Sequence, residues 1–177
     1  MSKADYEKTT ATSRHSVWKE LGFLCAKIIV VVGILLLVFT FVYGLHYNSD
    51  SGMNPAVKDG DLVMYYRWDK DYRAGDLTIV SFQEQLQIRR VVATAGDTVD
   101  ITQDGLIING SLQYEQDIYT QTNRYLEGID FPLTLKNNEV FVLGDARNDI
   151  SDSRIYGAVN IDDTKGSVIT ILRKRNL

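Results

Sequence analysis

An uncharged apolar run near the N-terminus limits what this chain can fold into. Residues 28–45 read IIVVVGILLLVFTFVYGL, which is 18 residues without a charged side chain. With the partly apolar LGFLCAK before it, the run reaches the ~20 residues that are needed to cross a bilayer. A buried helix of a soluble protein is the alternative, but such a helix rarely stays apolar on all faces for this length. We therefore predict a transmembrane segment over residues 21–45.

The flanks of this run predict an uncleaved anchor with its N-terminus in the cytoplasm. The run is longer than the roughly 7–15 residues of a signal-peptide core, and the HYNSD that follows offers no small-x-small cleavage site. Five Lys or Arg residues precede or enter the run, whereas the first one after it is Lys58. The positive-inside rule then places residues 1–20 in the cytoplasm as a flexible polar tail and residues 46–177 outside the cell membrane, in a single-pass arrangement.

The composition excludes several other classes of protein. The net charge is −4, which gives no support to a broad nucleic-acid-binding surface. Cys25 is the sole cysteine, so an internal disulfide is impossible. The acidic residues are scattered without the spacing of a metal site, and we expect neither a metal nor a cofactor.

Residues 46–177 are predicted to form an all-β domain of the Greek-key or barrel-like kind. Short segments rich in β-branched and aromatic residues alternate with turn-like pairs such as Asp104-Gly105, and helical periodicity is missing. Many short strands with close turns are typical of this architecture. Residues 111–138, polar and rich in tyrosine, are predicted to be a long excursion or small subdomain. The predicted strands are residues 62–67, 77–82, 86–94, 98–101, 106–109, 139–144 and 167–173.

Four separated motifs in this domain resemble the characteristic boxes of type I signal peptidases, the membrane-anchored serine proteases that remove signal peptides from exported proteins. SGMNPAVKDGD at residues 51–61 is similar to the Ser-Met-x-Pro box with its following Gly-Asp. GDLTIVSF at residues 75–82, IRRVVATAGD at 88–97 and GDARNDISDSR at 144–154 resemble the other three boxes. Gly-Asp pairs alone are common turns, but four boxes in order after a predicted anchor are specific. The resemblance implies an all-β catalytic fold with a hydrophobic, membrane-facing surface around the site.

The resemblance also implies where the catalytic residues of the family would stand, and each of those positions is altered. The position of the nucleophilic serine is Gly52, which has no hydroxyl. The position of the lysine general base is Arg89, whose guanidinium stays protonated and cannot accept a proton. The serine that orients the lysine is replaced by Ile150. A serine–lysine mechanism needs all three groups, so we predict that the chemistry is lost and that Arg89 fills or caps the emptied site.

The remaining residues of the motifs are interpreted as a binding groove or as structural turns and charged pairs. Met53 is expected to differ, as an apolar contact on the membrane or substrate side. If the segment around Gly52 is extended, Ser51 points away from the face of residue 52. The predicted groove and structural set is Asp50, Ser51, Met53, Pro55, Arg90, Asp145, Arg147, Asp152, Ser153 and Arg154.

These observations predict a membrane-anchored signal-peptidase-like protein that binds rather than cleaves. The chain resembles degenerate family members of Gram-positive pilus gene clusters, which implies an assembly factor or chaperone for sortase-built pili, with a pilin or pilus sortase as partner. One alternative is an active signal peptidase with a displaced nucleophile such as Ser51, assisted by His46. Another is a regulator that competes with a genuine signal peptidase for preproteins.

Overall fold

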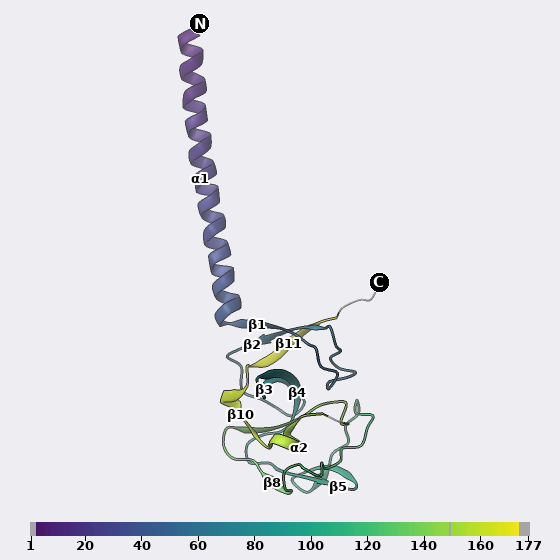
Figure 1. Ribbon diagram of the computed structural model, residues 1–177. Helices are drawn as coiled ribbons and strands as arrows, with labels where there is room; N and C mark the ends of the chain where they lie inside the picture. The colour runs from purple at the N-terminus through teal and green to yellow at the C-terminus, as the bar shows by residue number, and fades with distance from the viewer. Residues whose placement is uncertain (1–2, 149, 174–177) are drawn as a thin grey trace. The chain divides into compact units, whose positions relative to one another are not determined.

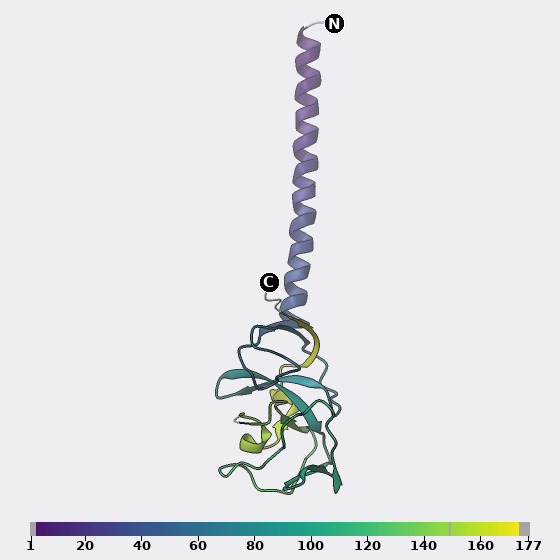
Figure 2. The same cartoon turned by 90° about the vertical axis from the view of Figure 1, so that its right-hand side faces the viewer.

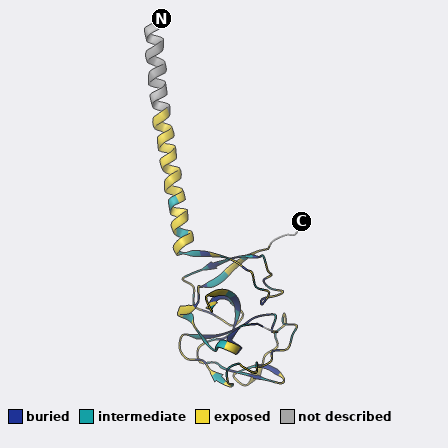
Figure 3. Ribbon diagram, in the orientation of Figure 1, coloured by how far each residue is buried: buried dark blue, intermediate teal, exposed yellow. Residues whose placement is uncertain are grey.

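The computed structural model describes residues 3–148 and 150–173, with side chains described from Trp18 onward. The chain divides into two units, residues 1–41 and 42–177. Helix α1 (Lys3–Phe41) makes up the first unit (Figure 1). Its segment Trp18–Phe41 is long and apolar enough to cross a membrane, and Figure 3 shows most of its residues as exposed and none as buried. An N-terminal apolar helix of this kind fits a membrane anchor.

The helix differs from the predicted segment at both ends. It extends back to Lys3, through a stretch predicted to be a flexible tail, and it ends at Phe41 rather than at Leu45. Strand β1 (Tyr43–Tyr47) takes up the last predicted residues of the span, because their backbone pairs antiparallel with β2 (Leu62–Tyr66). The apolar character of Leu45 therefore belongs to an exposed strand position and not to the helix.

The second unit contains two antiparallel sheets, and all seven strands that the sequence predicts are present with bounds that agree to within one residue. The larger sheet has the order β1-β2-β11-β3-β4-β9-β10. Strands β1, β2 and β11 lie at one end of the unit and β5 and β8 at the other, in both views (Figures 1 and 2). The bounds of its further strands are β3 (Leu77–Phe82), β4 (Gln85–Ala93), β9 (Glu139–Leu143), β10 (Val159–Asn160) and β11 (Ser167–Leu172).

The smaller sheet has the order β7-β6-β5-β8, and its two outer strands, β7 and β8, lie within the predicted excursion of residues 111–138. Residues 113–132 of the excursion form turns and irregular chain. Two short helices, α2 and the 3-10 helix η1, follow β9. The bounds of these elements are β5 (Thr98–Thr102), β6 (Gly105–Ile108), β7 (Ser111–Leu112), β8 (Leu133–Thr134), α2 (Ser153–Tyr156) and η1 (Ile161–Asp163).

The expectation of a barrel-like closure is wrong for the part of the chain that the structure describes. The larger sheet is open, with β1 and β10 as its edges. Strand β10 pairs with β9 over two residues only, and β11 meets β3 at the single pair Ser167↔Thr78. The edge strands β1 and β10 do not pair with each other, so the larger sheet does not close into a barrel and the fold is all-β with open sheets.

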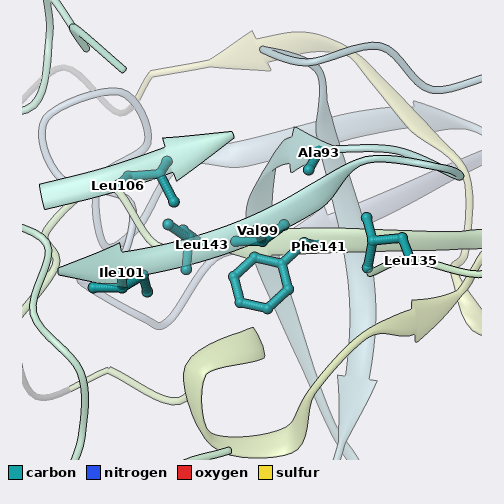
Figure 4. Packing of buried hydrophobic residues seen from close by; sticks show 7 residues of the cluster. All are labelled: Ala93, Val99, Ile101, Leu106, Leu135, Phe141 and Leu143. Atoms are coloured by element: carbon teal, nitrogen blue, oxygen red, sulfur yellow. The ribbon is translucent and has the colours of Figure 1, made fainter. Parts of the chain in front are cut away.

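Two apolar clusters position the site. The first joins the two sheets, with Phe141 of β9 packed against Val99 of β5 among the seven residues shown in Figure 4. The second packs the β1–β2 connection onto the larger sheet, through Met53 and Val57 against Ile79 and Ile88. Burial of apolar area of this kind stabilises a loop that would otherwise be mobile.

Candidate functional site

The β1–β2 connection, residues 48–61, is a closed and packed loop rather than an extended strand. Its two ends are joined by hydrogen bonds in which the Asn48 N–H donates to the Asp61 carbonyl (2.9 Å) and the Gly60 N–H donates to the Asn48 carbonyl (2.8 Å). Turn bonds follow within the loop, for example from the Val57 N–H to the Met53 carbonyl (2.9 Å). The condition under which Ser51 would point away from the face of residue 52, an extended segment, is therefore not met, because these residues form turns and Ser51 is exposed.

Met53 occupies a different place from the one predicted. It is 1% exposed and packs in the apolar cluster of Val57, Val63, Ile79 and Ile88. The prediction that Met53 contacts membrane or substrate is therefore wrong, since its side chain anchors the loop in the core. Pro55, two residues later, lies exposed on the outside of the loop.

Gly52 sits in a space that leaves little room for a side chain. A Cβ atom there would lie 3.0 Å from both carboxylate oxygens of Asp50 and 3.1 Å from Nη1 of Arg89. The Gly52 N–H donates to Oδ1 of Asp50 (2.6 Å), and the Gly52 carbonyl accepts from the Ala146 N–H (3.0 Å). The loop conformation thus uses both backbone groups of Gly52 and places an ion pair where a side chain would begin.

Arg89 of β4 is 2% exposed and is held from several sides. Its Nη1 donates to Oδ2 of Asp50 (2.7 Å) and to the Ile88 carbonyl (2.6 Å), while its Nε donates to the Ser151 carbonyl (2.9 Å). The Asp50 side chain is 34% exposed and faces the adjoining cavity. A buried guanidinium needs such a charged partner and hydrogen bonds to compensate its lost hydration.

Ile150 lies in the same neighbourhood, so the structure brings the three altered positions together. Ile150 is 8% exposed and lines the cavity that Asp50 and Arg89 also line. Its Cγ2 would lie 2.9 Å from a Cβ atom placed on Gly144, and that Cβ would lie 2.7 Å from the Gly52 carbonyl oxygen. Ile150 therefore fills space beside the Gly52 loop with hydrocarbon and offers no polar side-chain atom.

A cavity of about 930 Å³ opens beside this cluster. Its volume lies near the top of the range of ~300–1,000 Å³ that ligand sites in proteins occupy. Three apolar residues, Leu86, Ala146 and Ile150, contribute to its lining. The uncharged polar residues that line it, apart from His46, are Ser49, Ser51, Gln85, Gln87, Asn148 and Ser151. A groove therefore persists next to the altered positions.

One wall of the cavity is a strand edge. β4 pairs with β3 along Gln85–Arg90, but its pairing with β9 begins only at Arg90. The Val91 N–H donates to the Asp76 carbonyl on the β3 side, so the backbone groups of Leu86 and Ile88 point to the opposite edge. The Ile88 carbonyl already accepts a hydrogen bond from the Arg89 side chain. The backbone of Leu86 is therefore the part of this edge that is open for pairing with an added strand.

The retained charged residues of the motifs form buried or half-buried pairs. Arg90 binds Asp145 through two hydrogen bonds (2.8 and 2.6 Å), and this contact raises the pKa of Arg90. Arg147 pairs with Glu115 of the excursion and donates to its Thr122. All of these side chains except Arg90 and Glu115 are fully buried or nearly so.

The end of the fourth motif is a second such network. Arg154 and Asp152 are joined by two hydrogen bonds (2.9 and 2.7 Å), and both side chains are at most 1% exposed. Asp152 also accepts from the Gly144 N–H (3.2 Å) and caps α2 by accepting from the Arg154 N–H (3.0 Å). The Ser153 Oγ accepts from the Val142 N–H (3.0 Å). These contacts tie β9, the Gly144 turn and α2 together.

Two features of the site lie beyond what the sequence reasoning found. Tyr125 of the excursion reaches the cluster, where its hydroxyl accepts from the Ile150 N–H (2.9 Å). Asp50 was placed in the groove, but its bond to Arg89, 39 residues away, carries no sequence signal. Among the side chains that the structure describes, no group of three or more His, Cys, Asp and Glu could hold a metal ion.

Comparisons with known proteins agree on one family. The model of the family described as signal peptidase, peptidase S26, matches residues 21–172. A signal peptidase I of Bacillus amyloliquefaciens is 26% identical over 167 residues, covering 86% of this chain and 84% of the relative. A signal peptidase I of Bacillus licheniformis is 29% identical over 140 residues, covering 72% and 74%. A solved signal peptidase I from Enterococcus faecalis V583 has 26% identity and a TM-score of 0.47, covering 58% of this chain and 99% of the solved chain.

Proposed function

This chain belongs to the signal peptidase family, peptidase S26, and we propose that it is a member that binds a peptide in the groove beside Gly52 without cleaving it. In this proposal the anchor keeps its N-terminus in the cytoplasm and the β unit stands outside the membrane. The client is an extended polypeptide segment, and the process is the assembly of sortase-dependent pili, in which the chain acts as an assembly factor or chaperone for a pilin or a pilus sortase.

The observation that carries this proposal is the ion pair between Arg89 and Asp50 beside Gly52. A serine–lysine mechanism requires a hydroxyl and a neutral amine within hydrogen-bond reach of each other. Here the place beside residue 52 is taken by a guanidinium and a carboxylate bonded at 2.7 Å, and the described side chains around them offer no lysine. A filled catalytic position next to an open cavity supports retention of the groove for binding.

The association with pili rests on resemblance. The geometry supports the binding of an extended client peptide. The open edge of β4 at Leu86 suits an extended client, because main-chain pairing holds a peptide regardless of the chemistry of its side chains. The deletion of the gene in the strain that encodes it should abolish polymeric pili, and the full chain should restore them. Normal pili in the deletion strain, with altered secretion of many proteins, would support the competing regulator instead.

A second candidate function has one specific observation in its favour. His46, Ser49 and Ser51 line the same cavity as Arg89. Burial lowers the pKa of His46, so its imidazole is neutral at pH 7 and able to accept a proton from a serine hydroxyl. An active peptidase with a displaced serine–histidine pair, in line with the names of the curated relatives, is therefore the rival to binding without cleavage.

A cleavage assay separates the two candidates. The full chain in detergent is incubated with a preprotein that carries a small-x-small site, and the signal peptidase I of Bacillus amyloliquefaciens serves as the active control. We expect no product from this chain under conditions in which the control completes the reaction. Cleavage that disappears in Ser51→Ala or His46→Ala would establish the displaced pair and remove the binding-only proposal.

A further inference from the structure

We infer that the groove beside Gly52 accepts a segment with uncharged polar side chains, in preference to the small apolar residues of a signal-peptide cleavage site or to charged residues. This inference rests on the proposed function, because it specifies which peptides the groove binds. It follows from the lining of the cavity, from the mutual neutralisation of its two central charges and from the side chain of Gln87, a lining residue whose buried acceptor has no hydrogen-bond donor among the described residues.

The lining of the cavity offers mainly hydrogen-bonding groups. Six serine, glutamine and asparagine side chains line it, against three apolar ones. Gln85 and Gln87 lie on the same face of β4 as Arg89, because side chains alternate along a strand. An apolar client would bury these groups without partners, which is unfavourable for each group left unsatisfied. A polar client exchanges their bonds to water for bonds to itself.

The charges of Arg89 and Asp50 at the base of the groove neutralise each other, so neither is free to pair with a charged group of a client. The Oδ2 of Asp50 accepts from Arg89 at 2.7 Å, so a positive client group that approaches Asp50 also approaches a guanidinium. A negative client group that approaches Arg89 meets the Asp50 carboxylate in the same way, and Arg89 itself is 2% exposed. A charged side chain would lose hydration on entry without a free counter-charge, and this disfavours charged clients of either sign.

Gln87 adds a specific point of recognition. Its side-chain Oε1 is buried, and none of the described residues donates a hydrogen bond to it. A buried acceptor without a donor destabilises the free protein, and rotation of the Gln87 side chain into the cavity that it lines would let a client hydroxyl or amide N–H relieve that cost. The open backbone of Leu86 is the neighbouring residue on the same strand. A client strand paired at Leu86 thus places its own side-chain donors beside Gln87.

Peptide binding to the full chain tests this inference. Three fluorescent ten-residue peptides are compared by anisotropy in detergent: one rich in Ser, Thr and Asn, one of small apolar residues with a small-x-small pattern, and one with alternating Lys and Glu. Empty micelles serve as the control for partitioning. We expect the polar peptide to bind about tenfold more tightly than the other two, which corresponds to roughly one net hydrogen bond. Equal or tighter binding of the apolar or charged peptide overturns the inference and leaves the proposed function standing.

Variants locate the preference in the groove. Gln87→Leu should weaken binding of the polar peptide by about tenfold, and Gln85→Leu, at an exposed position, should weaken it less. Gln103→Leu, an exposed glutamine outside the cavity, is the matched control and should bind like the unmodified chain. An unchanged affinity in both groove variants overturns the inference. If none of the three peptides binds the unmodified chain, the proposed binding function itself fails.

Discussion

Arg89 and Arg154 are both fully buried arginines bonded to an aspartate, yet they do different things in the molecule. Arg154 and Asp152 are both sealed from solvent, and their network joins α2, the Gly144 turn and the excursion through Asn123. Arg89 bonds to an Asp50 that is one-third exposed to a cavity, next to a glycine. The same buried arginine–aspartate pair therefore holds the fold together in the fourth motif and fills a site in the third. Position relative to the cavity, and not residue type, distinguishes the two roles.

The largest effect is expected from Arg154→Met. The change leaves the carboxylate of Asp152 buried without its counter-charge, and breaking such a pair costs about 3–5 kcal/mol. The free energy of unfolding of the full chain, measured by denaturant titration in detergent with near-UV circular dichroism, should fall by that amount. Arg124→Met is the matched control, because Arg124 and Asp100 form a pair at 46% and 29% exposure that is worth about 0–1 kcal/mol. Equal losses in the two variants would contradict the structural role of Arg154.

A smaller effect is expected at the filled site, with a definite order between the two partners. Asp50→Ala leaves the Arg89 charge buried, but the carbonyls of Ser151 and Ile88 still accept from it, so we expect a loss of about 2–3 kcal/mol. Arg89→Met leaves Asp50 close enough to solvent to be hydrated, so its loss should be less. The same unfolding measurement decides the order. A greater loss in Arg89→Met would show that Asp50 depends on the pair more than its exposure indicates.

Gly52→Ser adds a side chain to the crowded space beside Asp50 and Arg89. The free energy of unfolding should fall by about 1–3 kcal/mol, the range for overpacking a well-packed site. Because the nearest atoms belong to Asp50 and Arg89, the cost should shrink when Asp50→Ala is also present. A double-mutant cycle with these two changes measures the coupling through the free energy of unfolding. Additive losses would mean that the loop moves away from Asp50 and that the glycine is not required by the pair.

Much of the fold could be predicted, because short runs rich in β-branched and aromatic residues lie between turn pairs, and β2 and β5 also alternate in burial. Strand β1 was hidden because Tyr43–Tyr47 continue the apolar run of the helix, and α2 was hidden because four residues are too few to show a period. The altered positions Gly52, Arg89 and Ile150 could be found from motif spacing. The charged pairs could not, since Arg89 and Asp50 are 39 residues apart, Arg147 and Glu115 are 32 residues apart, and only the folded chain brings the partners together.

The smallest effect, no detectable cleavage, is expected from the variant that restores the family residues in part. In Gly52→Ser combined with Arg89→Lys, the carboxylate of Asp50 would stand beside the new lysine as it stands beside Arg89 now. An adjacent negative charge raises the pKa of a lysine, so the amine would stay protonated and would not accept the serine proton. Under the proposal of binding without cleavage, Asp50 thus joins Gly52, Arg89 and Ile150 as a residue that opposes catalysis. We expect cleavage of a preprotein only after Ile150→Ser and Asp50→Ala are added, with a rate that rises with pH as the lysine becomes neutral. Robust cleavage by the double variant alone would show that Asp50 does not keep the new lysine protonated. It would also show that two substitutions are enough to restore a catalytic site.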